Sequence, residues 1–244
     1  MVAVLSRLGV QLQYPPEQTC CGQPAYNSGY RREAASAASR FIELFRDAPA
    51  IVCPSGSCVH MVRHHYPTLF PDDPAMREQA LQIGRKTYEF TEYLVDVLGI
   101  TNAGTQIGSR HTGTVTYHDS CHLARGLGIR RQPRLLLETM PGLVLSEMAE
   151  SDRCCGFGGT FSVNYADISA ALAEEKADNA LAAGADTLTG CDVSCLMNIR
   201  GILSRRKQPM RVLHIAEILD PTRPAVSPET NRELSTSTTK KVLR

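Results

Sequence analysis

Hydrophobic and polar positions in the second half of the chain follow two periods, which predict a series of strands and helices. Residues 114–117 alternate as a strand does, whereas 166–183 is an Ala-rich stretch typical of a helix. Strands that alternate with helices pair in parallel, so we expect an α/β fold with a doubly wound sheet. The predicted strands are 113–118, 143–148, 186–190 and 210–216, and the predicted helices are 130–140, 166–183 and 195–204.

The first half carries a shorter version of this series. A predicted helix at 31–46 leads into a short apolar strand at 50–55, and an amphipathic helix at 72–86 connects the halves. The segment TYEFTEYLVDVLG, which closes the first half, is similar to RVLHIAEILD in the second. We therefore predict two tandem pseudo-repeated units, each with a parallel sheet flanked by helices, and a disordered tail rich in Ser, Thr, Pro and charge. The predicted boundaries are 1–100, 101–220 and 221–244.

Each unit is marked by the triplet Cys-Cys-Gly. In the first unit 31 residues separate Cys21 from the next cysteine, Cys53, and in the second 35 residues separate Cys155 from Cys191. A further cysteine closes each series, and a leading one, Cys121, follows the first strand of the second unit. The full set is Cys20, Cys21, Cys53, Cys58, Cys121, Cys154, Cys155, Cys191 and Cys195.

The first unit has no counterpart of the leading cysteine. Cys121 stands 33 positions before Cys154, and the same offset from Cys20 falls before Met1. We therefore expect the first unit to be N-terminally truncated, without its leading strand and cysteine, through a misassigned start codon.

Composition and charge exclude several function classes. The 244 residues carry a formal net charge of +1, so no basic field favours nucleic acid. The sequence has no apolar run of about 18 residues that could span a membrane, and its first residues lack an export signal. A cytoplasmic protein is expected, and in a reducing cytosol clustered cysteines bind metal or carry out redox chemistry more often than they form disulfides.

The predicted fold gathers these sulfur atoms. Cysteines that follow parallel strands meet at one edge of the sheet, where α/β proteins bind ligands. Gly22 and Gly156 allow close backbone approach, and helix N-termini at that edge stabilise thiolates. Soft thiolate ligands select zinc or iron–sulfur clusters. Adjacent cysteines are awkward at two corners of one tetrahedral zinc site, which favours a cluster.

The stretches QTCCGQPAYNSGY, PSGSC, SCH, CCGFGGTFSV and CLMNI resemble those of the CCG cysteine-rich domain proteins. That group includes the CCG-containing component of heterodisulfide reductase and the iron–sulfur component of glycolate oxidase, and the strings are most similar to the lactate utilization protein A family. The ferredoxin-type motifs of the glycolate oxidase component are absent from the sequence. The resemblance implies iron–sulfur clusters, of the 4Fe-4S type and of cubane or non-cubane form. It also implies a redox subunit in the oxidation of L-lactate to pyruvate, with lactate utilization proteins B and C as partners.

The resemblance also implies ligands. The second site would use Cys121, Cys154, Cys155 and Cys195, whereas Cys191 departs from the usual Cys-x-x-Cys spacing. The first site would use Cys20, Cys21 and Cys58, with Cys53 as the fourth ligand.

Other readings stay open beside this one. The vicinal cysteines could cycle as a metal-free thiol–disulfide module, or zinc could occupy a site that only assembles partners. For His118 and His122, which flank Cys121, a hydrogen-bonding or structural role is favoured over ligation. The group of His60, His64 and His65 is expected on a partly exposed helical surface.

Overall fold

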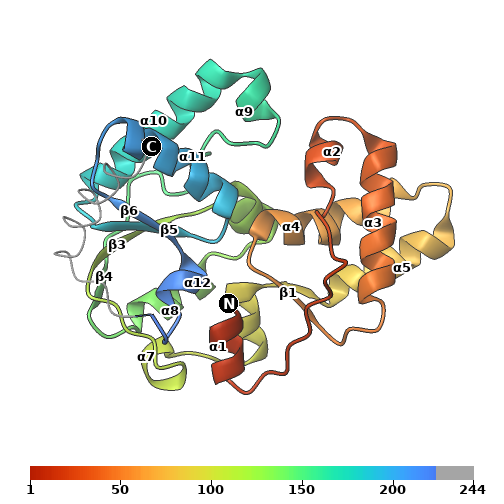
Figure 1. Cartoon of the computed structure of the whole chain (residues 1–244), viewed down its shortest axis with the longest axis horizontal. Helices are drawn as coiled ribbons and strands as arrows, with labels where there is room; N and C mark the ends of the chain where they lie inside the picture. The colour runs from red at the N-terminus through yellow and green to blue at the C-terminus, as the bar shows by residue number, and fades with distance from the viewer. Residues whose placement is uncertain (224–244) are drawn as a thin grey trace, which may run out of the picture.

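Six short strands form two parallel sheets in the part of the chain that the computed structural model describes, residues 1–223 (Figure 1). One sheet pairs β1 with β2, and the other has the order β4-β3-β5-β6. Helices flank these sheets, so the predicted α/β fold with parallel sheets is confirmed. The strands are β1 (Ile51–Cys53), β2 (Thr87–Glu89), β3 (Gly113–His118), β4 (Leu143–Leu145), β5 (Thr187–Gly190) and β6 (Arg211–His214).

Helices and single helical turns connect the strands. The α-helices are α1 (Val2–Arg7), α2 (Gln23–Asn27), α3 (Arg31–Phe45), α4 (Gly56–His60), α5 (Pro74–Arg85), α6 (Phe90–Glu92), α7 (Ala103–Gln106), α8 (Arg131–Glu138), α9 (Phe161–Asn164), α10 (Ala166–Ala182), α11 (Val193–Arg205) and α12 (Ile215–Ile218). The π-helical turns are η1 (Met61–His65), η3 (Tyr93–Val97) and η4 (His122–Gly126), and η2 (Tyr66–Leu69) is a 3-10 turn.

Three strands, β1, β4 and β6, end earlier than predicted. β4 stops at Leu145, three residues before the predicted end, and the next side chains turn to other partners: Ser146 donates to the Ala183 carbonyl and Glu147 pairs with Arg134. β6 stops at His214 because its imidazole accepts from the Ala216 backbone and begins α12. The predicted tail, 221–244, lies outside the described residues from 224 onward.

The two similar closing segments share a local geometry. β2 ends at Glu89 and β6 ends at His214, and each of these residues is the N-cap of the next helix. In both cases a glutamate three residues later, Glu92 or Glu217, accepts from the N-cap backbone and completes a capping box. The sequence similarity of these segments therefore corresponds to a strand followed directly by a capped helical turn.

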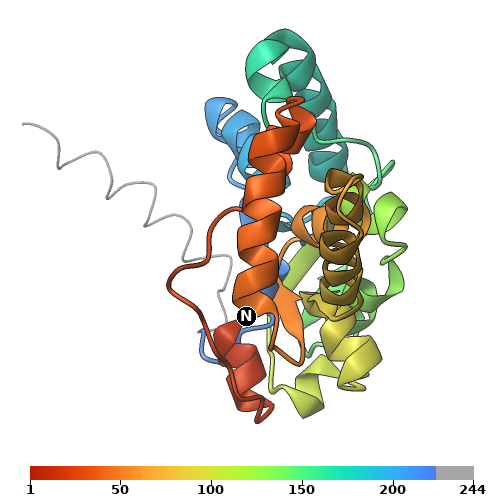
Figure 2. The same cartoon turned by 90° about the vertical axis from the view of Figure 1, so that its right-hand side faces the viewer.

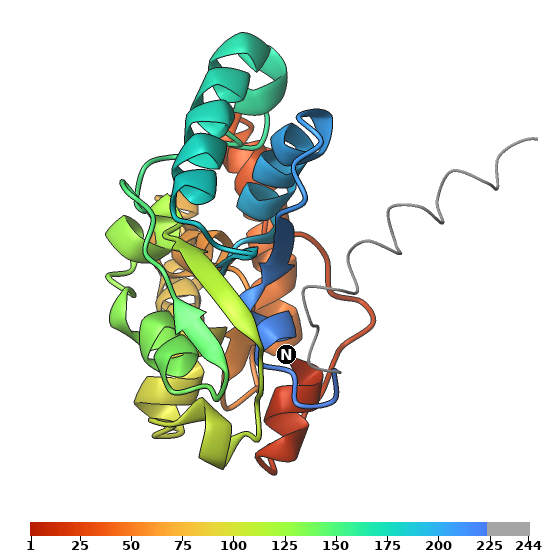
Figure 3. The same cartoon turned by 90° about the vertical axis from the view of Figure 1, so that its left-hand side faces the viewer.

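One hydrophobic cluster joins the two halves of the chain. Val4 of α1 and Phe90 of α6 pack with Val115 and Tyr117 of β3 and with Ile215 of α12. A second cluster lies under α10 and α11, which are side by side (Figure 3), and a third lies among α3, α5 and η1 (Figure 2). The main core thus crosses the predicted boundary at residue 100, and the division into 1–100 and 101–220 stays a prediction.

α4 lies between the four-stranded sheet and the helices α2, α3 and α5 (Figure 1). Its approach to η4 is so close that a Cβ atom on Gly56 would lie 2.7 Å from Leu123 Cβ. Within residues 1–223, no helix has the length and apolar character needed to cross a membrane.

Candidate metal centre

Four of the predicted ligands come together in the second half of the chain. Cys154 contacts Cys121 on one side and Cys155 on the other, and Cys155 in turn contacts Cys195. Cys121 follows β3, the Cys154-Cys155 pair lies in the loop before α9, and Cys195 is in the first turn of α11. Segments that are distant in sequence therefore place four thiols in one connected set, which we call the second thiol site.

A histidine extends this site. One ring nitrogen of His118, the Cys155 thiol and the Cys195 thiol lie within 4.8 Å of one another, and all three residues are buried. His118 is the last residue of β3, so the strand end delivers its imidazole to the thiols. Three buried soft or borderline donors at this separation can hold a metal ion.

The thiols of this site differ in acidity. Contact with Cys121 and Cys155 holds the pKa of Cys154 far below its ordinary value, and the backbone N–H of Gly156 also donates to its sulfur at 3.4 Å. Cys121 and Cys155 act as donors to that thiolate, which raises their own pKa values. Thiolates are the form that binds metal, so the lowered pKa of Cys154 favours metal binding at this site.

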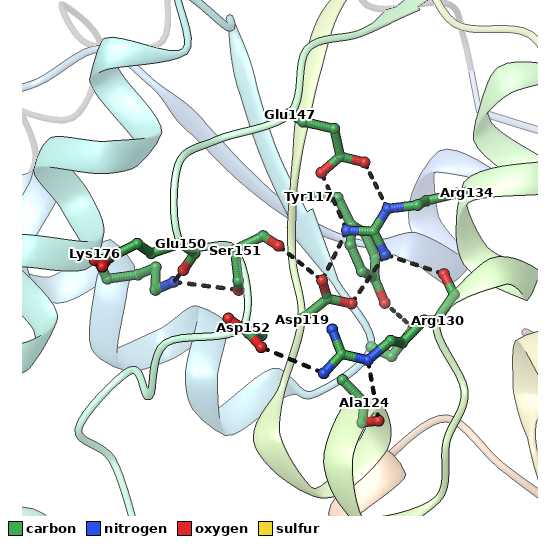
Figure 4. Close-up of polar contacts among 11 residues, drawn as sticks. Tyr117, Asp119, Ala124, Arg130, Arg134, Glu147, Glu150, Ser151, Asp152 and Lys176 are labelled. Carbon is green, nitrogen blue, oxygen red and sulfur yellow. Dashed lines mark hydrogen bonds and ion pairs between the residues drawn. The ribbon is translucent and has the colours of Figure 1, made fainter.

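A polar network fixes the two loops that carry these cysteines (Figure 4). Asp119, two residues before Cys121, accepts from Arg134 with both oxygens, at 3.0 and 2.7 Å, and from the Ser151 hydroxyl at 2.9 Å. The buried Lys176 donates to the carbonyls of Glu150 and Ser151, just ahead of Cys154. Burial alone would raise the pKa of Asp119, but Arg134 and Ser151 outweigh it and hold the pKa below its ordinary value.

The first half of the chain forms a smaller set of thiols, which we call the first thiol site. The Cys21 and Cys58 sulfurs lie 3.4 Å apart, and Cys53 also contacts Cys58. These two contacts and the Ser55 and Ser57 hydroxyls lower the pKa of Cys58 well below its ordinary value. Beneath them the buried Tyr66 donates to the Cys21 carbonyl at 3.0 Å.

The two thiol sites share details of backbone geometry. Cys58 and Cys195 each occupy the third position of a helix, α4 and α11. Gly22 and Gly156 have φ angles of 82° and 81°, in the left-handed region that favours glycine. A Cβ atom on Gly156 would lie 2.5 Å from the Ser169 carbonyl of α10, so the turn fits only glycine.

Asp192 connects the two sites. This residue is 2% exposed, and its carboxylate accepts from the hydroxyls of Ser55 and Ser57 at 2.8 Å and from the Ser57 backbone at 3.2 Å. Its other oxygen accepts from the Ser120 hydroxyl at 2.5 Å. One buried carboxylate thus links the start of α4, which carries Cys58, to the residue before Cys121.

The structure leaves two of the predicted ligands apart from these sets. Cys191 is fully buried against Tyr117, whose hydroxyl lies 3.2 Å from the thiol, and both belong to the main core. Cys155 and Cys195 belong to the cluster under α10 and α11 instead. Cys20 is adjacent to Cys21 in sequence, but its side chain is exposed.

His60 and His65 are half-buried and His64 is exposed, which agrees with the predicted partly exposed helical surface, and their rings lie close together. His60 lies 4.8 Å from His64, 4.9 Å from His65 and 5.0 Å from His122, measured between ring centroids. Burial and the neighbouring rings lower the pKa of His60 to about 4. Within residues 1–223 these imidazoles do not bring three ligand atoms within 4.8 Å, so the cluster packs α4 and η1 against η4.

Sequence reasoning missed the residues that support the sites. Lys176 could have been found, because it falls on the buried stripe of α10 with Ser169, Ala173, Ala177 and Ala180 at helical spacing. For Asp192 the available signal was a helix N-cap residue type two positions after a strand. The pairing of Asp119 with Arg134 had no signal, because 15 residues and a loop separate them.

Comparison with known proteins agrees with this arrangement. The chain matches the CCG cysteine-rich domain family over residues 1–63 and 115–200, the segments that carry both Cys-Cys-Gly triplets. It is 47% identical over 219 residues to lactate utilization protein A of Bacillus cytotoxicus, and 47% to lactate utilization protein A 1 of Bacillus cereus. Lactate utilization protein A 2 of Bacillus mycoides is 46% identical. Each alignment covers 90% of this chain and 90% of the relative.

The fold and its thiol sites therefore define a CCG cysteine-rich domain protein. Within that class, the chain belongs to the lactate utilization protein A family.

Proposed function

We propose that this chain is an iron–sulfur redox subunit of a multi-protein system that oxidises L-lactate to pyruvate. The observation that carries the proposal is the connected set of Cys121, Cys154, Cys155 and Cys195, with His118 beside it. The names of the relatives support the assignment to lactate oxidation, and the thiol ligands support an iron–sulfur cluster as the cofactor. A cytoplasmic location and the partner proteins B and C of the same system are part of the proposal.

The donor set fits an iron–sulfur cluster better than a single zinc ion. His118, Cys155 and Cys195 form a compact group, but Cys121 is reached only through Cys154. Four thiols and a neighbouring imidazole spread over such a chain of contacts suit several metal atoms, whereas one tetrahedral ion takes four equidistant ligands. When bound, a cluster accepts and releases single electrons at a potential that its ligands and surroundings set.

The chain's own residues prepare the sites for this role. Arg134 and Lys176 hold the loops on which Cys121 and Cys154 lie, so the ligands are positioned before metal arrives. Burial of Cys155 and Cys195 keeps water from the inner side of the second site. At the first site, Cys21, Cys53 and Cys58 are in contact and Cys20 is the exposed fourth thiol.

Anaerobic purification with iron, sulfide and zinc analysis and electron paramagnetic resonance tests the cofactor. We expect iron with acid-labile sulfide, and a paramagnetic signal that changes on reduction with dithionite. Cys155→Ser should remove the second-site share of the iron, whereas Cys191→Ser, outside the connected set, should keep the wild-type amount. One zinc per site without iron would support an assembly scaffold instead, and metal-free protein with a reversible disulfide would support a thiol–disulfide module.

The lactate assignment has a separate test. A strain that lacks this chain should lose growth on L-lactate and recover it with the wild-type gene but not with Cys155→Ser. Unchanged growth of the deletion strain, in the absence of a second lactate oxidase, would contradict the assignment and leave the cofactor proposal standing.

A further inference from the structure

His118 is a buried imidazole whose polar contact is with a thiol, that of Cys195. Its exposed fraction is 1%, and neither Nδ1 nor Nε2 hydrogen-bonds to a nitrogen or oxygen atom in residues 1–223. Burying polar atoms without partners is unfavourable, and most buried histidines bond through at least one nitrogen. The ring nitrogens of His118 therefore depend on the neighbouring sulfur atoms, or on a metal that these sulfur atoms hold, for a partner.

The sheet directs this imidazole to the thiols. Successive side chains of a strand point to opposite faces, so Tyr117 faces the main core and His118 faces the cluster that contains Cys155 and Cys195. Gly190 of β5 is the residue paired with His118. A Cβ atom there would lie 3.1 Å from the His118 carbonyl oxygen, so the close pairing of these two strand ends favours glycine.

The donors around His118 complete a ligand set. One of its ring nitrogens lies within 4.8 Å of the Cys155 and Cys195 sulfurs, and the imidazole also acts electrostatically on Cys154. His122, the other histidine beside the second thiol site, has different contacts. Its Nδ1 lies 3.8 Å from the Cys121 sulfur, and its ring packs against that of His60.

We propose that His118 is a nitrogen ligand of the metal centre at the second thiol site, which makes that site a mixed cysteine–histidine centre. The inference rests on the proposed iron–sulfur function and deepens it. A neutral imidazole brings no negative charge to the centre, whereas each thiolate brings one. Replacing thiolate by imidazole raises the reduction potential of an iron–sulfur centre, so the second site would be the easier of the two to reduce.

The test is pulsed electron paramagnetic resonance of the anaerobically reconstituted full chain, loaded with ferrous iron and sulfide. We expect a strong nitrogen hyperfine coupling that changes to the 15N pattern when histidine is isotopically labelled. The coupling should disappear in His118→Cys, which keeps a soft ligand for loading, and in His118→Gln. It should persist in the matched variants His122→Gln and His60→Gln.

Each other outcome overturns the proposal in a recognisable way. A loaded wild-type protein with only the weak coupling of hydrogen-bonded nitrogen would show that His118 donates to a sulfur and does not ligate. Coupling that survives in both His118 variants would assign the ligand elsewhere. Failure of the wild type to take up iron and sulfide would overturn the proposed function itself, and the ligand assignment with it.

Discussion

At the scale of single residues, the side of the sheet on which a side chain lies decides its chemistry. Cys191 and Cys195 are four positions apart, yet Cys191 packs on Tyr117 in the main core and Cys195 joins the second thiol site. The sequence showed an irregular Cys-x3-Cys spacing but not its meaning. The turn from β5 into α11 lies between the two cysteines. The direction of each side chain therefore depends on the backbone conformation of this turn, which the spacing does not reveal.

Cys191→Ala should therefore affect stability and spare metal loading. The variant removes a fully buried thiol and leaves the Tyr117 hydroxyl without this partner, which should cost about 1–2 kcal/mol of unfolding free energy. Iron content of the anaerobic protein should equal that of wild type, whereas Cys195→Ala should lose the second-site share. Equal iron loss in both variants would place Cys191 among the ligands.

Glu89 should make stability depend on pH. Burial raises its pKa to about 7, although Thr91 and Glu92 donate to one of its oxygens. The unfolded carboxyl titrates near 4.5, so between these values the folded state binds more protons than the unfolded state. The unfolding free energy should then fall as pH rises from 4.5 to 7, by up to about 3 kcal/mol.

Glu89→Gln removes the titratable carboxyl group and keeps an oxygen acceptor for Thr91. Its unfolding free energy relative to wild type should rise across pH 4.5–7, as measured by urea denaturation at several pH values. Burial lowers the pKa of His214, so this histidine also makes stability depend on pH, but it contributes equally to both proteins and the difference isolates Glu89. A difference that stays constant with pH would contradict the assignment.

At the scale of elements, the helices of the two halves meet with almost no side chain between them. Gly56 of α4 lies on Leu123 of η4, and Gly126 of η4 lies on the His60 ring. The long helices α3, α5 and α10 were predicted to within about two residues at each end because their composition and apolar periodicity are local signals. The π-helical turn η4 was not predicted, because its shape comes from this contact across the halves.

Gly56→Ala should destabilise the protein, since the added methyl group would overlap Leu123. The expected loss is about 1–3 kcal/mol of unfolding free energy. Gly201→Ala in α11 is the matched control: a Cβ atom there meets nothing within 4 Å, and the better helix propensity of alanine should add up to about 1 kcal/mol. Urea unfolding midpoints at matched iron content measure both; two variants that shift in the same direction would contradict the packing argument.

At the scale of the whole molecule, the two halves share one core and one buried carboxylate. Side chains of α1 and α6 pack with β3 and α12, and Asp192 binds Ser55, Ser57 and Ser120 at once. The sequence predicted the fold class and the convergence of the second-site cysteines, because parallel strands bring their ends to one edge. It did not predict this shared core, since periodicity reports which face is buried and not what covers it.

Fragments cut at the predicted boundary should not fold alone. A fragment of residues 1–100 would expose Val4, Phe90 and Leu94, which are buried in the whole chain. A fragment of residues 101–220 would expose the other side of the same cluster. Each fragment should show little protection from hydrogen exchange when expressed alone, and co-expression should restore it. Two separately protected fragments would establish 1–100 and 101–220 as independent domains.

The glycine contacts between α4 and η4 also bear on how such a chain can diverge. A larger residue at position 56 is tolerable only if position 123 becomes smaller, and the same exchange links 126 with 60. Natural variants should therefore change these positions in pairs. The contact between α4 and η4 should then appear as correlated substitutions among homologues.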